Sequence, residues 1–311
     1  MVKILADSTC DLSPELIQKY HIEIIPLYIR LGEKEYRDGI DIKPPELYKW
    51  SDEHGETPKT AAPGIEDIEN HLKKMEAEGT DENEKDSDGS GGNGFDGSGS
   101  ESTDSVNPDE YVIFTISSSM SASFNNCRLA AEDMEINDRV FIIDSENLST
   151  GIGLQILRAV DMAAAGKTGA EIATEMEQIR GKVRASFVVD TLTYLHRGGR
   201  CSGLAALLGS ALRLHPRIAV VNGAMRPEKK YRGKDVRYVM DYVRDMEKDL
   251  LNACNDRVFI THSGCSREIV DSVRAYLESL NHFDEILETR AGSVISSHCG
   301  PGTLGVLFIA D

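Results

Sequence analysis

Small hydroxyl residues follow four apolar segments of this sequence, and each segment has the length of a strand. They are Ser8 and Thr9 after residues 2–6, Ser117 and Ser118 after residues 111–116, Ser145 after residues 140–143, and Thr261 and Ser263 after residues 257–260. In open α/β sheets, ligands bind beyond the carboxyl ends of the strands. Hydroxyl and helix N-terminal amide groups there suit a carboxylate or a phosphate. Each hydroxyl alone is explained as a helix N-cap, but their recurrence favours an anion site.

A glycine pair flanked by two arginines is a second polar motif, formed by Arg197, Gly198, Gly199 and Arg200. Two guanidinium groups can clamp an acid through paired hydrogen bonds, although a solvated loop has the same composition. His298 precedes a Gly-Pro-Gly turn and could donate to a carboxylate, although a lone histidine in a turn is more often structural. Both motifs supply candidates for an anion site.

Motifs for several other chemistries are missing. The sequence holds no phosphate-binding loop of the form G-x-x-x-x-G-K-[ST] and no G-x-S-x-G nucleophile motif. Its six cysteines form no C-x-x-C pair and no cluster with histidine at zinc-ligand spacing, so we interpret them as free thiols. We therefore expect neither a cofactor nor a metal.

Short apolar runs alternate with amphipathic stretches along the chain. The first half has a βαβ pattern, for which a parallel sheet covered by helices is the economical solution. The second half contains Asn222-Gly223 between two apolar runs, a strong hairpin signal. We predict an α/β protein of two domains, residues 1–174 and 175–311. Within them we expect one strand over residues 22–29, an apolar helix over 203–213 and one long helix over 235–252.

The net charge of −18 is unevenly distributed. Residues 80–110 hold ten acidic residues against Lys85 alone, which is half of the net charge. Residues 80–108 are also rich in glycine and serine, which predicts a disordered acidic insertion. Nucleic-acid binding loses support because it needs a basic surface. The sequence offers neither an apolar run long enough to span a membrane nor a secretory leader, so we expect a cytoplasmic protein.

Six ordered motifs resemble those of the DegV family. They are Asp7-Ser8-Thr9-Cys10-Asp11-Leu12, Tyr36-Arg37-Asp38-Gly39-Ile40-Asp41, Thr60-Ala61-Ala62-Pro63, residues 116–123, residues 194–200 and residues 298–305. The resemblance implies two α/β domains, a parallel-sheet N-terminal domain and a mixed-sheet C-terminal domain, with a long-chain fatty acid in a tunnel between them. It implies that Thr60, Ser118 and His298 hold the fatty-acid carboxylate. Further head-group contacts are expected from Ser117, Arg197, Ser8 and Thr9.

The resemblance also implies a partner. An ATP-dependent fatty acid kinase subunit would phosphorylate the bound carboxylate for phospholipid metabolism, and Arg232 is the expected contact with it. The chain itself would be a carrier without catalytic residues. Two departures from the family pattern are Ser119 and Ala122, which replace glycines and would carry strain if a positive φ is needed there.

Two other functions remain open from the residues alone. A serine-dependent acyl hydrolase could use Ser118 as nucleophile with His298 as base, although no acid partner is evident. A protein that acts through its acidic insertion is the third hypothesis.

Overall fold

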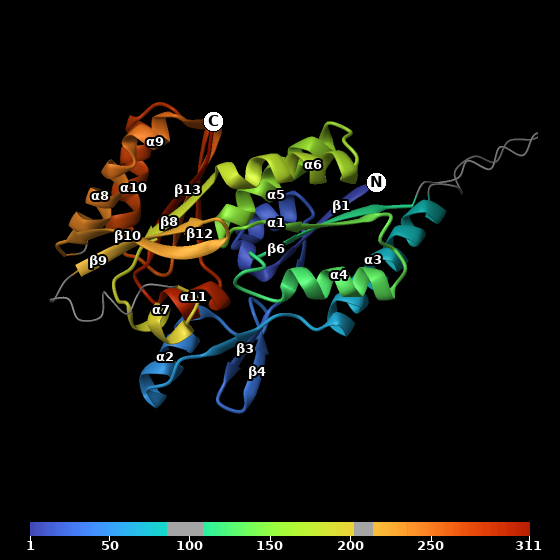
Figure 1. Cartoon of the computed structure of the whole chain (residues 1–311), viewed down its shortest axis with the longest axis horizontal. Helices are drawn as coiled ribbons and strands as arrows, with labels where there is room; N and C mark the ends of the chain where they lie inside the picture. The colour runs from blue at the N-terminus through green and yellow to red at the C-terminus, as the bar shows by residue number, and fades with distance from the viewer. Residues whose placement is uncertain (86–107, 202–213, 235) are drawn as a thin grey trace, which may run out of the picture.

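The computed structural model describes residues 1–85, 108–201, 214–234 and 236–311 (Figure 1). Much of the predicted insertion and the whole of the predicted helix over residues 203–213 lie outside the described residues. The described strands form three sheets, one parallel, one mixed and one antiparallel. The prediction of an α/β fold with a parallel N-terminal sheet and a mixed C-terminal sheet is confirmed.

The first sheet has the order β2-β1-β6-β7, and all its pairings are parallel. Its strands are β1 (Val2–Asp7), β2 (Glu23–Ile25), β6 (Glu110–Thr115) and β7 (Val140–Asp144). Leu5, Val112 and Ile113 are fully buried because helices cover both faces of a parallel sheet. The hydroxyl residues after β1 and β6 therefore meet at one edge of this sheet, as the sequence predicts.

The second sheet has the order β10-β9-β8-β13-β11-β12 and is antiparallel except for β11 and β12. Its strands are β8 (Val183–Val188), β9 (Leu214–Val221), β10 (Ala224–Arg232), β11 (Ala253–His262), β12 (Glu285–Arg290) and β13 (Leu304–Ala310). Asn222 and Gly223 both have positive φ, 49° and 74°, in the turn between β9 and β10. The predicted hairpin is confirmed.

The third sheet, β4-β3-β5, is absent from the sequence prediction. It comprises β3 (Tyr28–Leu31), β4 (Lys34–Arg37) and β5 (Lys59–Ala61). The prediction of one strand over residues 22–29 is wrong, because β2 and β3 belong to different sheets. Pro26 lies between them and has no backbone N–H to continue a ladder. Pairing of Ile29 with Thr60 then fixes β5 beside β3.

Helices pack around and between these sheets (Figure 1). They are α1 (Pro14–Lys19), α2 (Pro44–His54), α3 (Ile65–Lys85), α4 (Ser123–Asp133), α5 (Thr150–Ala164), α6 (Gly169–Ile179), α7 (Thr193–Gly198), α8 (Val236–Asp245), α9 (Glu247–Leu251), α10 (Arg267–Ser279) and α11 (Ser293–Cys299), with 3₁₀ turns η1 (Ser8–Cys10) and η2 (Arg180–Lys182). The single helix predicted over residues 235–252 is wrong. Buried Met246 separates α8 from α9, with ψ near 0°.

Helix α5 lies between the two large sheets and contacts β1, β6, β8, β11 and β13. Its residues Ile152, Ile156 and Ala159 are fully buried, in a core that also contains side chains of both sheets. The division of the chain at residues 174 and 175 stays a prediction. No helix among the described residues is long and apolar enough to cross a membrane.

Candidate functional site

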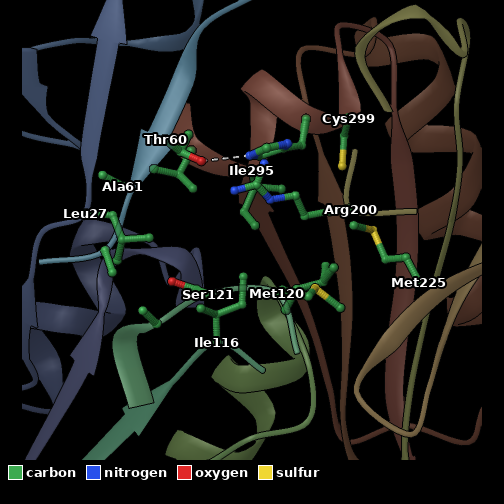
Figure 2. A pocket seen from close by; sticks show the side chains of 15 residues that line it. Leu27, Thr60, Ala61, Ile116, Met120, Ser121, Arg200, Met225, Ile295 and Cys299 are labelled. Carbon is green, nitrogen blue, oxygen red and sulfur yellow. Dashed lines mark hydrogen bonds between the residues drawn. The ribbon is translucent and has the colours of Figure 1, made fainter. Parts of the chain in front are cut away.

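A cavity of about 230 Å³ lies where segments of all three sheets meet. Its wall is mostly aliphatic, and its polar groups come from a few side chains (Figure 2). The lining residues are Leu27, Thr60, Ala61, Ala62, Ile116, Met120, Ser121, Ala122, Leu148, Arg200, Met225, Val294, Ile295, His298 and Cys299. We call this space the head-group cavity, after the role that the family resemblance implies for Thr60 and His298. Figure 2 shows Thr60 and Ile295 on one side of it, with Met120 and Ser121 across from them.

Two of the predicted site residues meet at this cavity. Thr60 Oγ1 lies 2.9 Å from His298 Nε2, a hydrogen bond between residues 238 positions apart (Figure 2). Thr60 is the central residue of β5, and His298 lies in the last turn of α11. The structure therefore brings together the hydroxyl of one motif and the imidazole of another.

The imidazole of His298 is neutral at pH 7. Burial, together with the charge of nearby Arg200, lowers its pKa to about 4. A neutral imidazole has one N–H donor and one acceptor nitrogen. Nδ1 is buried and has no hydrogen-bond partner among the described residues, which costs less for an acceptor than for a donor. We therefore assign the proton to Nε2, which donates to Thr60 Oγ1 and leaves the Thr60 hydroxyl free to donate.

The glycine-arginine motif surrounds His298 from the other side. Gly198 ends α7, and a Cβ built on it would lie 2.3 Å from His298 Nδ1, so no side chain fits there. Gly199 has a φ of 67°, a left-handed conformation that turns the chain back after the helix. Arg200 then lines the cavity, and its Nη1 donates to the Gly198 carbonyl oxygen at 2.8 Å. Arg197, the predicted contact, is exposed and is not among the described lining residues.

Ser118 forms no hydrogen bond with Thr60 or His298 among the described residues. Its side chain is exposed, its Oγ donates to Asp144, and its backbone N–H donates to Asp144 Oδ1 at 3.1 Å. Ser118 is not among the described residues that line the head-group cavity, whereas Ser121 of the same motif is. Ser121 Oγ lies 2.9 Å from Ser123 Oγ at the start of α4. Sequence reasoning missed Ser121 because an irregular loop has no periodicity to indicate which side chain points inward.

The other hydroxyl residues of these loops have structural partners. Ser117 is buried, and its Oγ lies 3.1 Å from that of Ser119. Ser8 Oγ donates to Asp38 Oδ2 at 2.9 Å and accepts from the Leu27 N–H at 3.1 Å. Thr9 donates to Asp7 through both its N–H and its hydroxyl. Ser8, Thr9 and Ser117 are not among the described residues that line the head-group cavity.

Ser119 and Ala122, which replace two glycines of the family motif, do not have the positive φ that would strain their backbone. Ala122 has a φ of −80°, and Ser119 is not among the non-glycine residues with positive φ. Ser119 instead donates through Oγ to the Gly223 carbonyl oxygen at 2.5 Å. This bond ties the loop to the hairpin turn of the second sheet.

A serine nucleophile with a histidine base would need a hydrogen bond between the two. No hydrogen bond joins Ser118 and His298 among the described residues, since Ser118 is bonded to Asp144 and His298 to Thr60.

The described residues contain no group of three or more His, Cys, Asp or Glu side chains that could hold a metal ion. Arg232, the expected partner contact, is exposed at the end of β10.

A second, smaller cavity of about 30 Å³ adjoins the first and has almost entirely apolar walls. Three residues, Leu148, Ile295 and Cys299, line both cavities and form the wall between them. The second cavity continues toward Phe187 and Leu307 of the second sheet. The polar groups of the site therefore lie in the larger cavity, and the smaller, apolar cavity lies on the other side of that wall, against core side chains of the second sheet.

An apolar cavity with a few converging polar groups, set between sheets, is typical of proteins that bind a small amphipathic molecule. This chain belongs to the DegV family, because the model of that family of uncharacterised proteins matches residues 1–82 and 103–311. The match passes over residues 83–102, which lie within the predicted insertion.

Individual relatives cover the chain almost completely. A protein of Thermotoga maritima named fatty acid-binding protein is 28% identical over 309 residues, which are 98% of this chain and 96% of the relative. A DegV family protein from Thermus thermophilus, described as binding fatty acid, superimposes with a TM-score of 0.82 at 25% identity over 100% of this chain and 99% of its own. A stearic acid-binding protein from Eubacterium ventriosum has a TM-score of 0.79 at 25% identity, over 100% and 98%.

Proposed function

We propose that this protein binds one long-chain fatty acid, with the carboxylate in the head-group cavity and the acyl chain directed past the shared wall into the smaller, apolar cavity. The observation that carries the proposal is the hydrogen-bonded pair of Thr60 and neutral His298 at the polar end of an aliphatic cavity. The printed names of the relatives from Thermotoga maritima, Thermus thermophilus and Eubacterium ventriosum support the same ligand class.

The carboxylate would be held by donors that the cavity wall supplies. A buried carboxylate is costly unless hydrogen bonds satisfy its oxygens. Thr60 would donate its hydroxyl proton to the carboxylate while it accepts from His298 Nε2. Ser121 and Arg200 line the same cavity and are the further donors that we propose. In this assignment Ser121 takes the role that the family resemblance gave to Ser118.

The acyl chain would supply most of the binding energy. Burying a chain of about 16 carbons at about 0.8 kcal/mol per methylene gives roughly 10 kcal/mol of gross driving force. The chain would leave the head-group cavity past Leu148, Ile295 and Cys299 and enter the smaller cavity. A path of this kind needs no specific polar contact beyond its mouth.

The protein would act as a carrier rather than an enzyme. We infer that a separate ATP-dependent kinase subunit phosphorylates the presented carboxylate, as the family resemblance implies. Exposed Arg232 at the end of β10 is the proposed contact with that subunit. Nothing in this role requires the protein to activate a nucleophile.

Extraction of the purified protein followed by mass spectrometry tests whether it carries a fatty acid. Fatty-acid titration of three variants then tests the head group. Thr60→Ala and Ser121→Ala should each weaken binding about tenfold or more, because a hydrogen bond to a charged group contributes about 1.5–3 kcal/mol. Ser118→Ala is the matched control from the same loop and should leave the affinity unchanged.

Two outcomes would overturn the proposal in different ways. Protein that is repeatedly recovered empty and binds no fatty acid on titration would refute the ligand class. If Ser118→Ala weakens binding and Ser121→Ala does not, the ligand class stands, but the assignment of Ser121 fails. Thermal unfolding of each variant checks that an altered affinity does not come from a lost fold.

A further inference from the structure

Three buried carboxyl groups lie beside the head-group cavity without lining it. Asp7, Asp11 and Asp38 are 1%, 5% and 3% exposed, and none is among the described lining residues. Two of them belong to the first motif of the chain and the third to the second. Within the described part of the chain, the hydrogen bonds that they accept come from hydroxyl and backbone N–H groups and not from basic side chains. Their burial therefore needs an explanation other than an ion pair.

Asp11 and Asp38 converge on the first residues of α11. Asp11 Oδ1 accepts from the backbone N–H of Gly292 at 2.8 Å, and Asp38 Oδ1 accepts from that of Ser293 at 2.8 Å. Gly292 is the N-cap of this helix, and Ser293 is its first residue. The initial N–H groups of a helix have no partner within it, so the two side chains satisfy donors that would otherwise be buried and unpaired.

The second oxygen of each carboxyl group is anchored elsewhere in the fold. Asp11 Oδ2 accepts from Ser149 Oγ at 2.5 Å, just before α5. Asp38 Oδ2 accepts from Ser8 Oγ at 2.9 Å, just after β1. The start of α11 is thus fixed to the edge of the parallel sheet through two side chains rather than through main-chain pairing.

Helix α11 carries His298 near its other end. His298 lies five residues after Ser293, which is about 7.5 Å along a helix at about 1.5 Å per residue. A helix of this length is stiff, so a shift at its first turn displaces its last turn by a similar amount. The hydrogen bond between His298 and Thr60 tolerates little displacement, since such bonds weaken steeply outside about 2.7–3.2 Å.

We propose that Asp11 and Asp38 are positioning residues, which set the place of the His298 imidazole by holding the first turn of α11. The inference rests on the proposed function only in taking His298 as part of the head-group site. It gives Asp11 and Asp38 a role at a carboxylate site whose cavity they do not line.

Asp7 provides a matched control. It is equally buried and accepts hydrogen bonds from the Thr9 N–H and hydroxyl and from the Ile116 N–H, none of them on α11. Its removal therefore carries the general cost of losing a buried carboxyl group without releasing the helix. A role of Asp11 and Asp38 in stability alone would make all three residues behave alike.

The test is the NMR spectrum of histidine labelled with ¹³C and ¹⁵N in the ligand-free protein, with the His298 signals assigned by His298→Gln. Asp11→Ala and Asp38→Ala should move the His298 imidazole signals and weaken fatty-acid binding about tenfold. Asp11→Asn and Asp38→Asn keep an oxygen acceptor for the helix N–H and should restore both. Asp7→Ala should leave the His298 signals in place.

A second pair of variants acts on the helix instead of the carboxyl groups. Ser293→Pro removes the N–H that donates to Asp38, and proline is well tolerated at the first position of a helix. Ser293→Ala keeps that N–H and removes only the hydroxyl, which donates to the Ile42 carbonyl oxygen. The His298 signals should move in Ser293→Pro and not in Ser293→Ala.

The inference is overturned if the His298 signals stay unchanged in folded Asp11→Ala, Asp38→Ala and Ser293→Pro. It is also overturned if Asp7→Ala moves them equally. The NMR signals are recorded in the ligand-free protein, so they test the position of His298 independently of fatty-acid binding. The proposed role of His298 in binding would fail separately, if the His298→Gln variant bound fatty acid with unchanged affinity.

Discussion

At the scale of single residues, the site depends on an imidazole that its surroundings keep uncharged. Burial and the proximity of Arg200 lower the pKa of His298, so at pH 7 the neutral ring can donate through Nε2 to the Thr60 hydroxyl. The ring fits because residue 198 has no side chain. Gly198, between the two arginines of its motif, is thus explained by the close approach of the His298 ring.

Gly198→Ala tests this close approach. The new methyl group would lie 2.3 Å from His298 Nδ1, so the ring must move away and its bond to Thr60 must lengthen or break. We expect fatty-acid affinity to fall about tenfold or more, although alanine favours a helix by about 1 kcal/mol over glycine. Isothermal titration with a fatty acid measures the change.

Gly181→Ala is the control for that substitution. Its added methyl group would meet nothing within 4 Å, and residue 181 has no positive φ. The affinity of this variant should equal that of the unchanged protein. Equal affinities of Gly198→Ala and Gly181→Ala would contradict the packing argument.

At the scale of elements, two short helices decide the geometry of the site. Helices α7 and α11 pack against each other and carry Gly198 and His298. Neither helix is predicted from the sequence, because six or seven residues hold too few turns to show an amphipathic period. The glycines at their ends favour loops instead, and tertiary packing stabilises them as helices. Helix α11 packs against α2 and β3, and Tyr194 of α7 contacts Tyr48 of α2 edge to face.

Ile295 on α11 should control the length of the acyl chain. It lines both cavities, so Ile295→Ala opens the wall between them. We expect the ratio of affinities for an 18-carbon over a 14-carbon acid to rise about tenfold, because about two or more further methylenes reach an apolar wall at about 0.8 kcal/mol each. Competition titration with the two acids measures this ratio.

Val294→Ala separates that effect from a general loosening of α11. Val294 is equally well buried in the neighbouring position but lines only the head-group cavity. The chain-length ratio should not change in this variant. A ratio that changes in both variants, or in neither, would argue against a path through the wall at Ile295.

At the scale of the whole molecule, buried acids link stability to pH. Burial raises the pKa of Asp11 to about 8, with the negative charges of Asp38 and Asp7 adding to the effect. In the unfolded chain the same group ionises near its ordinary value of about 3.9. Between these two pH values the folded state holds a proton that the unfolded state has lost. The free energy of unfolding therefore falls as the pH rises toward 8.

Urea unfolding between pH 7 and pH 8.5 measures this dependence. The slope from Asp11 should reach at most about 1.4 kcal/mol per pH unit at the lower end and vanish above its pKa. Asp11→Asn resembles the protonated acid in shape and hydrogen bonding, so it should remove most of the slope. A wild-type protein whose stability does not fall over this range would contradict the raised pKa.

The sequence predicts some residues of the candidate site better than others. Thr60 and His298 were identified through family motifs, and the structure joins them by a hydrogen bond. Ser118 came from the same kind of argument, yet its side chain is exposed and bound to Asp144, while Ser121 lines the cavity. Motif matching identifies a loop, but the direction of each side chain in that loop depends on its φ and ψ angles.

The sequence by itself determined what depends on near neighbours in the chain. The apolar runs of the parallel sheet, the Asn222-Gly223 hairpin and the order of the six motifs are all local patterns. Only the tertiary structure decided which distant segments meet: Thr60 with His298, and Asp11 and Asp38 with the start of α11. The physical reason is that a hydrogen bond between residues far apart in sequence forms only where packing of the whole core holds both partners within about 3 Å.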